Sequence, residues 1–177
     1  LAAALCDTVL GEGTYRVLET YKGADLENKE YEPLFSFVSP KERCWYVVCD
    51  DYVTLTDGTG IVHIAPAFGE DDAKVGRKYG LPLVQLVDGR GNMTQEMTAE
   101  TQWPGVFCKD ADKEILKDLE SRGLLFSAPK FEHSYPFCWR CDTPLIYYAR
   151  ESWYIEMTKV KDQLIRNNNT VHWLPES

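Results

Sequence analysis

The chain has 177 residues, a length typical of one domain that buries its own core; 44% of the residues are hydrophobic and 27% are charged. No apolar run approaches the roughly 18 residues that a membrane helix needs, so the composition indicates a soluble cytoplasmic protein without a membrane span. A net charge of −9 argues against a stand-alone, high-affinity nucleic-acid binder, because phosphate contacts need clustered Lys and Arg.

The chain begins LAAALCDTVL, which has no initiating Met and none of the three regions of a signal peptide. We therefore expect a fragment of a longer protein. The six cysteines are irregularly spread and have no secretory context, which favours reduced thiols over a disulfide framework.

Much of the first half of the chain predicts short strands. Four segments are rich in β-branched, aromatic or alternating apolar residues and are bounded by turns or charges: 14–21, 44–49, 61–64 and 81–87. Asp57 and Gly58 are expected to form the turn that leads into the third of them.

Three helices are expected among these strands. The first covers about 70–79 and ends at Gly80; the second covers 111–122, with Asp110 as N-cap and Gly123 as its stop; and the last contains Val160 and Leu164 and ends at Asn167–Asn169.

The stretch from about 131 to 157 is expected to form further short strands. The whole pattern predicts a mixed α/β fold that is mainly β, barrel-like and built as a single domain over residues 1–177, with a few short helices.

The segment GTGIVHIAPAFGEDD, residues 58–72, is the first candidate site. A strand delivers His63 to its end, and a proline-containing loop then leads to the acidic residues 70–72. Loop backbone and a carboxylate suit a pocket for a ligand that carries an ammonium group. The alternative is structural: the glycines shape a hairpin, His63 packs in the sheet, and the acids stabilise a helix N-terminus. Spacing alone favours the structural explanation.

A second candidate site is CWRC, in which Cys138 and Cys141 have the spacing of a zinc knuckle. The pair supplies only two of four ligands, and the chain has no second pair of this kind. A redox dithiol or two unligated thiols remain alternatives.

Aromatic residues are frequent between Tyr135 and Tyr154, and such side chains can stack on nucleotides. They are not interleaved with a basic stripe, so packing between strands is the favoured explanation.

Taken in order, five motifs resemble the connective-peptide insertion of isoleucyl-tRNA synthetases: GTGIVHIAPAFGEDD, KDADK, HSYPFCWRCDTPLIY, SWYIEMTKV and VHWLPE. The resemblance covers nearly the whole chain. The valyl and leucyl enzymes share related versions of the first motif, whereas the long third motif is similar to the isoleucyl type. This ordered set reverses the preference for a structural explanation of residues 58–72.

The resemblance implies a barrel-like editing domain that hydrolyses valine attached in error to tRNA(Ile), within a class I ligase that uses ATP and Mg. By the same resemblance, Asp72 holds the α-ammonium group of the substrate and His63 lines the pocket, and both belong to the catalytic site. The substrate-binding residues are expected to be Ala65, Pro66, Ala67, Phe68 and Asp71. Editing itself is expected to need no cofactor.

The resemblance also implies parts that this chain lacks. A threonine-rich wall of the pocket and the second cysteine pair of a zinc knuckle would lie upstream of Leu1, so zinc is expected only in the parent enzyme. Residues from about 130 to 177 would include the return towards the catalytic domain. The expected partners are tRNA(Ile), misactivated valine and the rest of the synthetase, with no membrane. The alternative function is a non-catalytic insert that positions tRNA and contributes half of the zinc knuckle.

Overall fold

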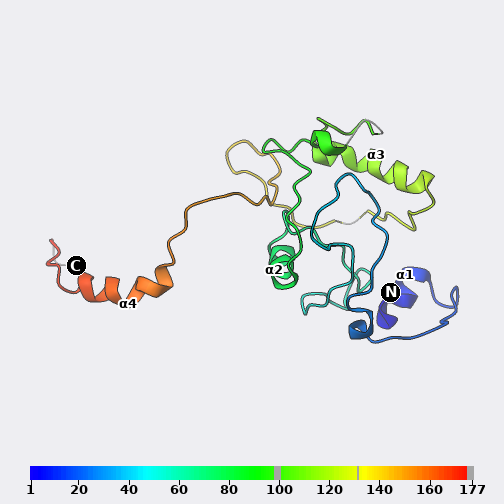
Figure 1. The fold of residues 1–177 in the computed structure, drawn as a ribbon, viewed down its shortest axis with the longest axis horizontal. Coiled ribbons are helices and arrows are strands. Elements are labelled where there is room, and N and C mark those ends of the chain that lie inside the picture. Colours follow the sequence, from blue (N-terminus) through cyan, green and yellow to red (C-terminus); the bar gives the residue numbers. More distant parts are fainter. Residues whose placement is uncertain (98–100, 131, 175–177) are drawn as a thin grey trace.

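The computed structural model describes residues 1–97, 101–130 and 132–174. Within these ranges the α-helices are α1 (Cys6–Leu10), α2 (Glu70–Tyr79), α3 (Cys108–Ser121) and α4 (Met157–Asn168) (Figure 1). Short 3₁₀ helices cover Ala3–Leu5, Gly23–Leu26 and Gln95–Met97. The remainder of the described chain forms turns, loops and extended connections.

The prediction of a mainly β, barrel-like fold is wrong. The described ranges contain isolated antiparallel bridges in place of strands: Glu30 with Tyr46, Val87 with Met93, Asn92 with Phe107, and Phe137 with Pro144. Each pairing stops after one bridge, so no sheet face forms. The apolar residues of the first predicted strand show the consequence, because Val17 and Leu18 stay exposed with no layer over them. A segment with strand propensity forms a sheet only when it pairs with neighbouring segments over several residues, and the described ranges show single bridges in place of such pairing.

The predicted helices agree better with the structure. α2 has the predicted bounds, and Gly80 ends it with a positive φ of 66°. α4 contains Val160 and Leu164 and ends within the asparagine cluster. Both are local patterns, in which the periodicity of the side chains and the stop signal lie within one segment.

α3 begins earlier than predicted. Its N-cap is Phe107, whose side chain makes no capping bond, and Asp110 lies in the first turn. The earlier start follows from a non-local contact, because the N–H of Cys108 donates to the carbonyl of Gly91 at 2.9 Å. Gly123 follows the helix with a positive φ of 66°, as expected for a stop residue.

The largest buried cluster joins α3 to the loops beside it. Met93, Met97, Trp103 and Ala111 are all buried, and Ala111 contributes from α3. Phe35 and Phe37 stack on each other at 5.3 Å between ring centroids, and both meet the ring of Trp103 edge-on. This aromatic packing fixes the loop around residue 35 against the α3 side of the molecule.

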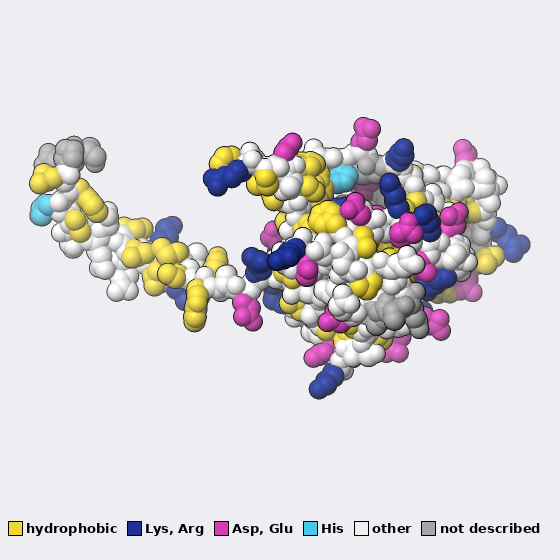
Figure 2. Space-filling model, turned by 90° about the horizontal axis from the view of Figure 1, so that it is seen from above, with side chains coloured by type: hydrophobic (Ala, Val, Ile, Leu, Met, Phe, Trp, Pro, Cys, Tyr) yellow, Lys and Arg dark blue, Asp and Glu magenta, His cyan; other side chains and the backbone are white. Residues whose placement is uncertain are grey.

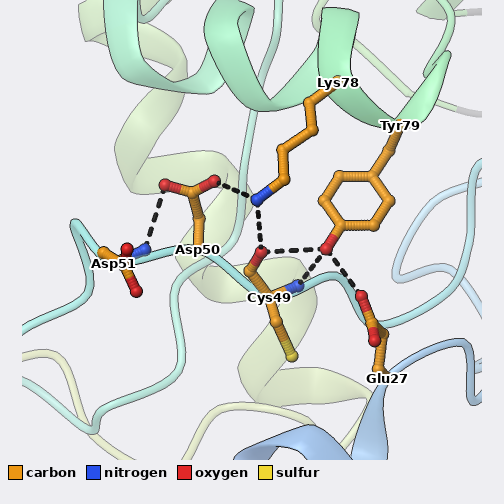
Figure 3. A network of polar contacts seen from close by, with 6 residues as sticks. All are labelled: Glu27, Cys49, Asp50, Asp51, Lys78 and Tyr79. Carbon is orange, nitrogen blue, oxygen red and sulfur yellow. Dashed lines mark hydrogen bonds and ion pairs between the residues drawn. The ribbon is translucent and has the colours of Figure 1, made fainter.

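Polar contacts at the C-terminal end of α2 hold it to two other segments (Figure 3). The hydroxyl of Tyr79 donates to Glu27 at 2.6 Å and accepts from the N–H of Cys49 at 3.2 Å. Lys78 forms an ion pair with Asp50 at 2.8 Å and also donates to the carbonyl of Cys49. These contacts fix the end of the helix, and thereby the orientation of its first turn.

The C-terminal segment leaves the body of the molecule as an arm that carries α4 (Figure 1). Hydrophobic side chains lie along the arm (Figure 2), and Trp153 and Tyr154 are 103% and 90% exposed. The last two residues of the VHWLPE motif, 175 and 176, lie outside the described ranges. Among the helices that the structure describes, none combines the length and apolar character that crossing a membrane requires.

Candidate functional site

The loop at residues 65–68 connects residues 61–64 to Gly69 and the first turn of α2. The N–H of Phe68 donates to the carbonyl of Ala65 at 2.8 Å and closes a turn. Gly69 then serves as the N-cap of α2, and the helix starts with Glu70, Asp71 and Asp72. Three acidic residues in a first turn suit the positive end of the helix dipole.

Asp72 is the acid of this turn that faces back to the loop and to Tyr52. One carboxylate oxygen accepts from the Tyr52 hydroxyl at 3.2 Å, and the other accepts from the N–H of Ala65 at 3.0 Å. A Cβ on Gly69 would lie 2.6 Å from the second oxygen, so only glycine leaves room for the carboxylate in this position. The Asp72 side chain is therefore held on three sides.

Asp71 has different surroundings although it is the adjacent residue. Its carboxylate is exposed and forms an ion pair with Lys74 at 2.9 Å on the helix surface. Glu70 also pairs with Lys74, at 3.1 Å. The structure thus brings Asp72, and not Asp71, together with Tyr52 and the loop.

A hollow of about 480 Å³ is lined in part by Tyr52, the hydrogen-bond partner of this carboxylate. Two short segments line it: residues 52–54 and 57–63. Tyr52 therefore borders the hollow and contacts Asp72 at the same time. His63 is exposed and lines the hollow from the end of the second segment. Within the described residues it makes no hydrogen bond to Asp72.

The loop residues predicted to bind substrate have mixed surroundings. Ala67 is buried, and its carbonyl accepts from the N–H of Ala149 at 3.0 Å. Pro66 packs so closely on α2 that a Cβ at Gly76 would lie 2.9 Å from its ring. The ring of Phe68 meets that of Tyr148 edge-on. These contacts make the loop a rigid support, while Ala65 contributes its N–H to Asp72.

A second hollow, of about 290 Å³, is lined in part by Phe68. Its lining comes from the 65–68 loop, from Met93, from α3 and from both sides of the cysteine pair: Phe68, Met93, Cys108, Lys109, Asp112, Tyr135, Ile146 and Tyr147. Lys109 lies over the ring of Tyr135 at 4.8 Å from the centroid. The prediction that the aromatic residues of this region pack between strands is not confirmed, because Trp139 and Tyr147 are 87% and 66% exposed. Tyr135 does meet Phe137 edge-on.

Cys138 and Cys141 lie together on a tight turn. The N–H of Asp142 donates to the carbonyl of Cys138, and the N–H of Cys138 donates to the carbonyl of Thr143, both at 2.8 Å. Hydrogen bonds from Thr143, and then from Cys138, lower the pKa of the exposed Cys141 thiol. A lowered thiol pKa favours the thiolate that binds metal. In the ranges that the structure describes, no third His, Cys, Asp or Glu joins the pair, so its residues fit half of a tetrahedral site.

Sequence reasoning did not identify Tyr52 or Gly69 as parts of the site. Tyr52 lies 20 positions before Asp72, and nothing in the spacing of the chain indicates their contact. The DYV sequence that contains Tyr52 reads only as the start of a strand. Gly69 could have been noticed as a glycine directly before the acidic turn, a position where close approach of a side chain is common.

The ionisation of Tyr52 gives a first prediction. Partial burial, followed by the charge of Asp72 and their hydrogen bond, raises the Tyr52 pKa from 10.0 to about 12. The neutral phenol is thus favoured in the folded state, and its stabilising contribution is complete below pH 10 and is lost as the pH rises towards 12. In an ultraviolet phenolate titration, Tyr52→Phe should remove one late-titrating tyrosine. Loss of an early-titrating tyrosine in its place would contradict the Asp72 contact.

No protein-family model matches the chain. The chain is 52% identical over all of its 177 residues to isoleucine-tRNA ligase of Clostridium acetobutylicum, of which it covers 17%. It is 48% identical over 167 residues to the ligase of Thermus thermophilus, covering 94% of this chain and 15% of that protein. It is also 48% identical over 177 residues to the ligase of Streptomyces avermitilis.

The chain belongs, as a segment, to the isoleucine-tRNA ligase family. The alignment with the Clostridium acetobutylicum ligase extends over the whole chain and therefore spans the hollow, Asp72 and the cysteine pair. The chain spans about one sixth of the length of these curated relatives and therefore corresponds to one portion of a much longer enzyme. The resemblance deduced from the five motifs is confirmed at the level of the family.

Proposed function

We propose that this segment is the editing part of an isoleucine-tRNA ligase and hydrolyses valine from misacylated tRNA(Ile). One observation carries the proposal: a carboxylate, Asp72, is held by Tyr52 and the Ala65 N–H beside a hollow of about 480 Å³. A fixed carboxylate of this kind suits the α-ammonium group of an aminoacyl ester. Membership in the ligase family supplies the substrate class.

The need for such a site follows from the limits of binding. A pocket that accepts isoleucine rejects valine only by the contribution of one methylene group, and this enzyme family is itself the standard example of that limit. A second site that admits only the smaller side chain removes the error by hydrolysis.

In the proposed reaction, water attacks the ester carbonyl that joins valine to the terminal ribose. Asp72 orients the ester through its ammonium group, and His63 borders the space that receives the side chain. The leaving hydroxyl of the ribose takes up the proton, so valine and free tRNA are released. No metal or organic cofactor takes part in this step, while ATP and Mg serve the ligation reaction of the longer enzyme.

The remaining partners are part of the same proposal. The net charge of −9 leaves tRNA binding mainly to the rest of the ligase, which we expect to act in the cytoplasm.

The N–H of Ala2 donates to the carbonyl of Thr59 at 2.8 Å, next to the hollow. A threonine-rich wall from upstream of Leu1, as the resemblance implies, would start beside the hollow.

Gly69→Ala tests the position of Asp72 without removing it. The added Cβ would lie 2.6 Å from the Asp72 oxygen, so the carboxylate must move and lose its bond to Ala65. The φ of Gly69 is −134°, which alanine adopts without strain. We expect valyl-tRNA hydrolysis to fall by roughly tenfold, the value of about one hydrogen bond to a charged group. The rate is measured by release of labelled valine.

Gly23→Ala is the matched control for that change. Gly23 has no atom within 4 Å of an added Cβ and lacks a positive φ, so hydrolysis should stay unchanged. Equal rates for the Gly69 and Gly23 variants would show that the position of Asp72 does not matter for the reaction.

A second function has an observation of its own. The exposed turn with Cys138 and Cys141 supports a non-catalytic insert that completes a zinc knuckle with another part of the ligase. Those two thiolates would supply half of the coordination shell, and the metal would hold the insert in place.

Ligand binding separates the two functions. We would measure binding of a non-hydrolysable valyl-adenosine analogue and of its isoleucyl counterpart to this chain. An editing site should bind the valyl compound more tightly, whereas an insert that only positions tRNA should not distinguish them.

A further inference from the structure

The contact between Tyr52 and Asp72 joins the lining of the hollow of about 480 Å³ to a carboxylate that is not part of that lining. Tyr52 lines the hollow, whereas Asp72 is not one of the lining residues and contacts the lining through the Tyr52 hydroxyl. The hydroxyl of Tyr52 therefore links the carboxylate of Asp72 to a residue of the lining.

The direction of the hydrogen bond determines what Tyr52 can do. Its hydroxyl donates to Asp72 at 3.2 Å, so the phenol oxygen keeps its lone pairs for a further donor. The Ala65 N–H occupies the other carboxylate oxygen at 3.0 Å. Two fixed donors set the rotation of the carboxylate but leave acceptor capacity on both of its oxygens. An ammonium group, with three donors, matches an arrangement of adjacent acceptors.

We propose that Tyr52 is a positioning residue that orients Asp72 and, with it, forms the acceptor pair for the α-ammonium group of the ester substrate. This inference rests on the proposed editing function and assigns part of its amino-acid recognition to Tyr52. Tyr52 thereby couples the hollow to a carboxylate that lies outside its lining.

A second tyrosine provides an internal comparison. The Tyr79 hydroxyl also donates to a carboxylate, that of Glu27, at 2.6 Å. Tyr79 additionally contacts the backbone of Cys49 and lines neither hollow. The Tyr79 contact therefore joins segments of the fold, whereas the Tyr52 contact lies at the ligand space.

The test uses a full-length isoleucine-tRNA ligase that carries this segment, with Tyr52→Phe, Tyr79→Phe and the unchanged protein compared. Each is assayed on valyl-tRNA and on the same tRNA esterified with the 2-hydroxy analogue of valine, which has no ammonium group. Thermal unfolding and tRNA charging with isoleucine are measured in parallel to follow folding and ligation.

Tyr52→Phe should lower the hydrolysis of valyl-tRNA by roughly three- to tenfold, the value of one hydrogen bond. It should leave hydrolysis of the hydroxy ester at the rate of the unchanged protein, because the group that the acceptor pair binds is absent. Tyr79→Phe should lower the unfolding temperature without this substrate-dependent loss.

Four results would overturn the inference. An equal loss on both esters, or an equal loss in the two tyrosine variants, would mean that Tyr52 acts only through the fold. No loss on valyl-tRNA in Tyr52→Phe would remove Tyr52 from recognition while leaving editing intact. Failure of the unchanged protein to hydrolyse valyl-tRNA would overturn the editing function itself, together with the inference.

Discussion

Asp72→Ala should reduce the hydrolysis of valyl-tRNA(Ile) by about ten- to a hundredfold in a ligase that carries this segment. The estimate corresponds to the loss of a hydrogen bond between charged groups. The reason is geometric, because Asp72 is the carboxylate that Tyr52 and the Ala65 N–H hold beside the hollow. The remaining hydrolysis should also discriminate less between valine and isoleucine, since the ester is no longer oriented.

Glu70→Ala is the control for this change. Glu70 lies in the same turn, carries the same charge and pairs with Lys74 on the surface. Removing it should leave editing within twofold of the unchanged rate, as expected for an exposed ion pair that contributes little. If both substitutions lower hydrolysis equally, the effect comes from the charge of the helix N-terminus and the assignment of Asp72 is wrong.

Trp103→Ala should lower the free energy of unfolding by about 3–5 kcal/mol, the usual cost of removing a large aromatic side chain from a core. Trp103 is only 6% exposed and contacts the stacked rings of Phe35 and Phe37 within the cluster that includes Ala111 of α3. Truncation would leave a cavity at the centre of that cluster. Urea unfolding followed by circular dichroism measures the change.

Trp153→Ala provides the matched comparison, because this tryptophan lies fully exposed on the C-terminal arm. Its removal should change the free energy of unfolding by no more than about 0.5 kcal/mol. Similar destabilisation by the two substitutions would contradict the position of the core.

Helices α2 and α4 were predictable because their signals are local. The acidic turn after the 65–68 loop and the stop at Gly80 lie within about fifteen residues of sequence. The CWRC turn is equally local, and the structure places its two cysteines together. Family membership was predictable from the order of the motifs, and the comparisons confirm it.

Whether the predicted strands pair, and which groups contact Asp72, both depend on residues that are distant in the sequence. Residues 44–49 have strand composition, but only Tyr46 forms a bridge, to Glu30. Composition describes what a segment favours and does not supply the partner that would extend the pairing. The start of α3 at Cys108 and the contact of Tyr52 with Asp72 were missed for the same reason, since each depends on a residue 17 to 20 positions away.

The central claim is that this segment carries an editing site, and comparative deacylation tests it most directly. Valyl-tRNA(Ile) and isoleucyl-tRNA(Ile) are incubated with a full-length ligase that carries this segment, and release of each amino acid is followed over time. We expect rapid release of valine and little release of isoleucine. Equal release of both amino acids, or release of neither, would contradict an editing role for the segment and leave a structural insert.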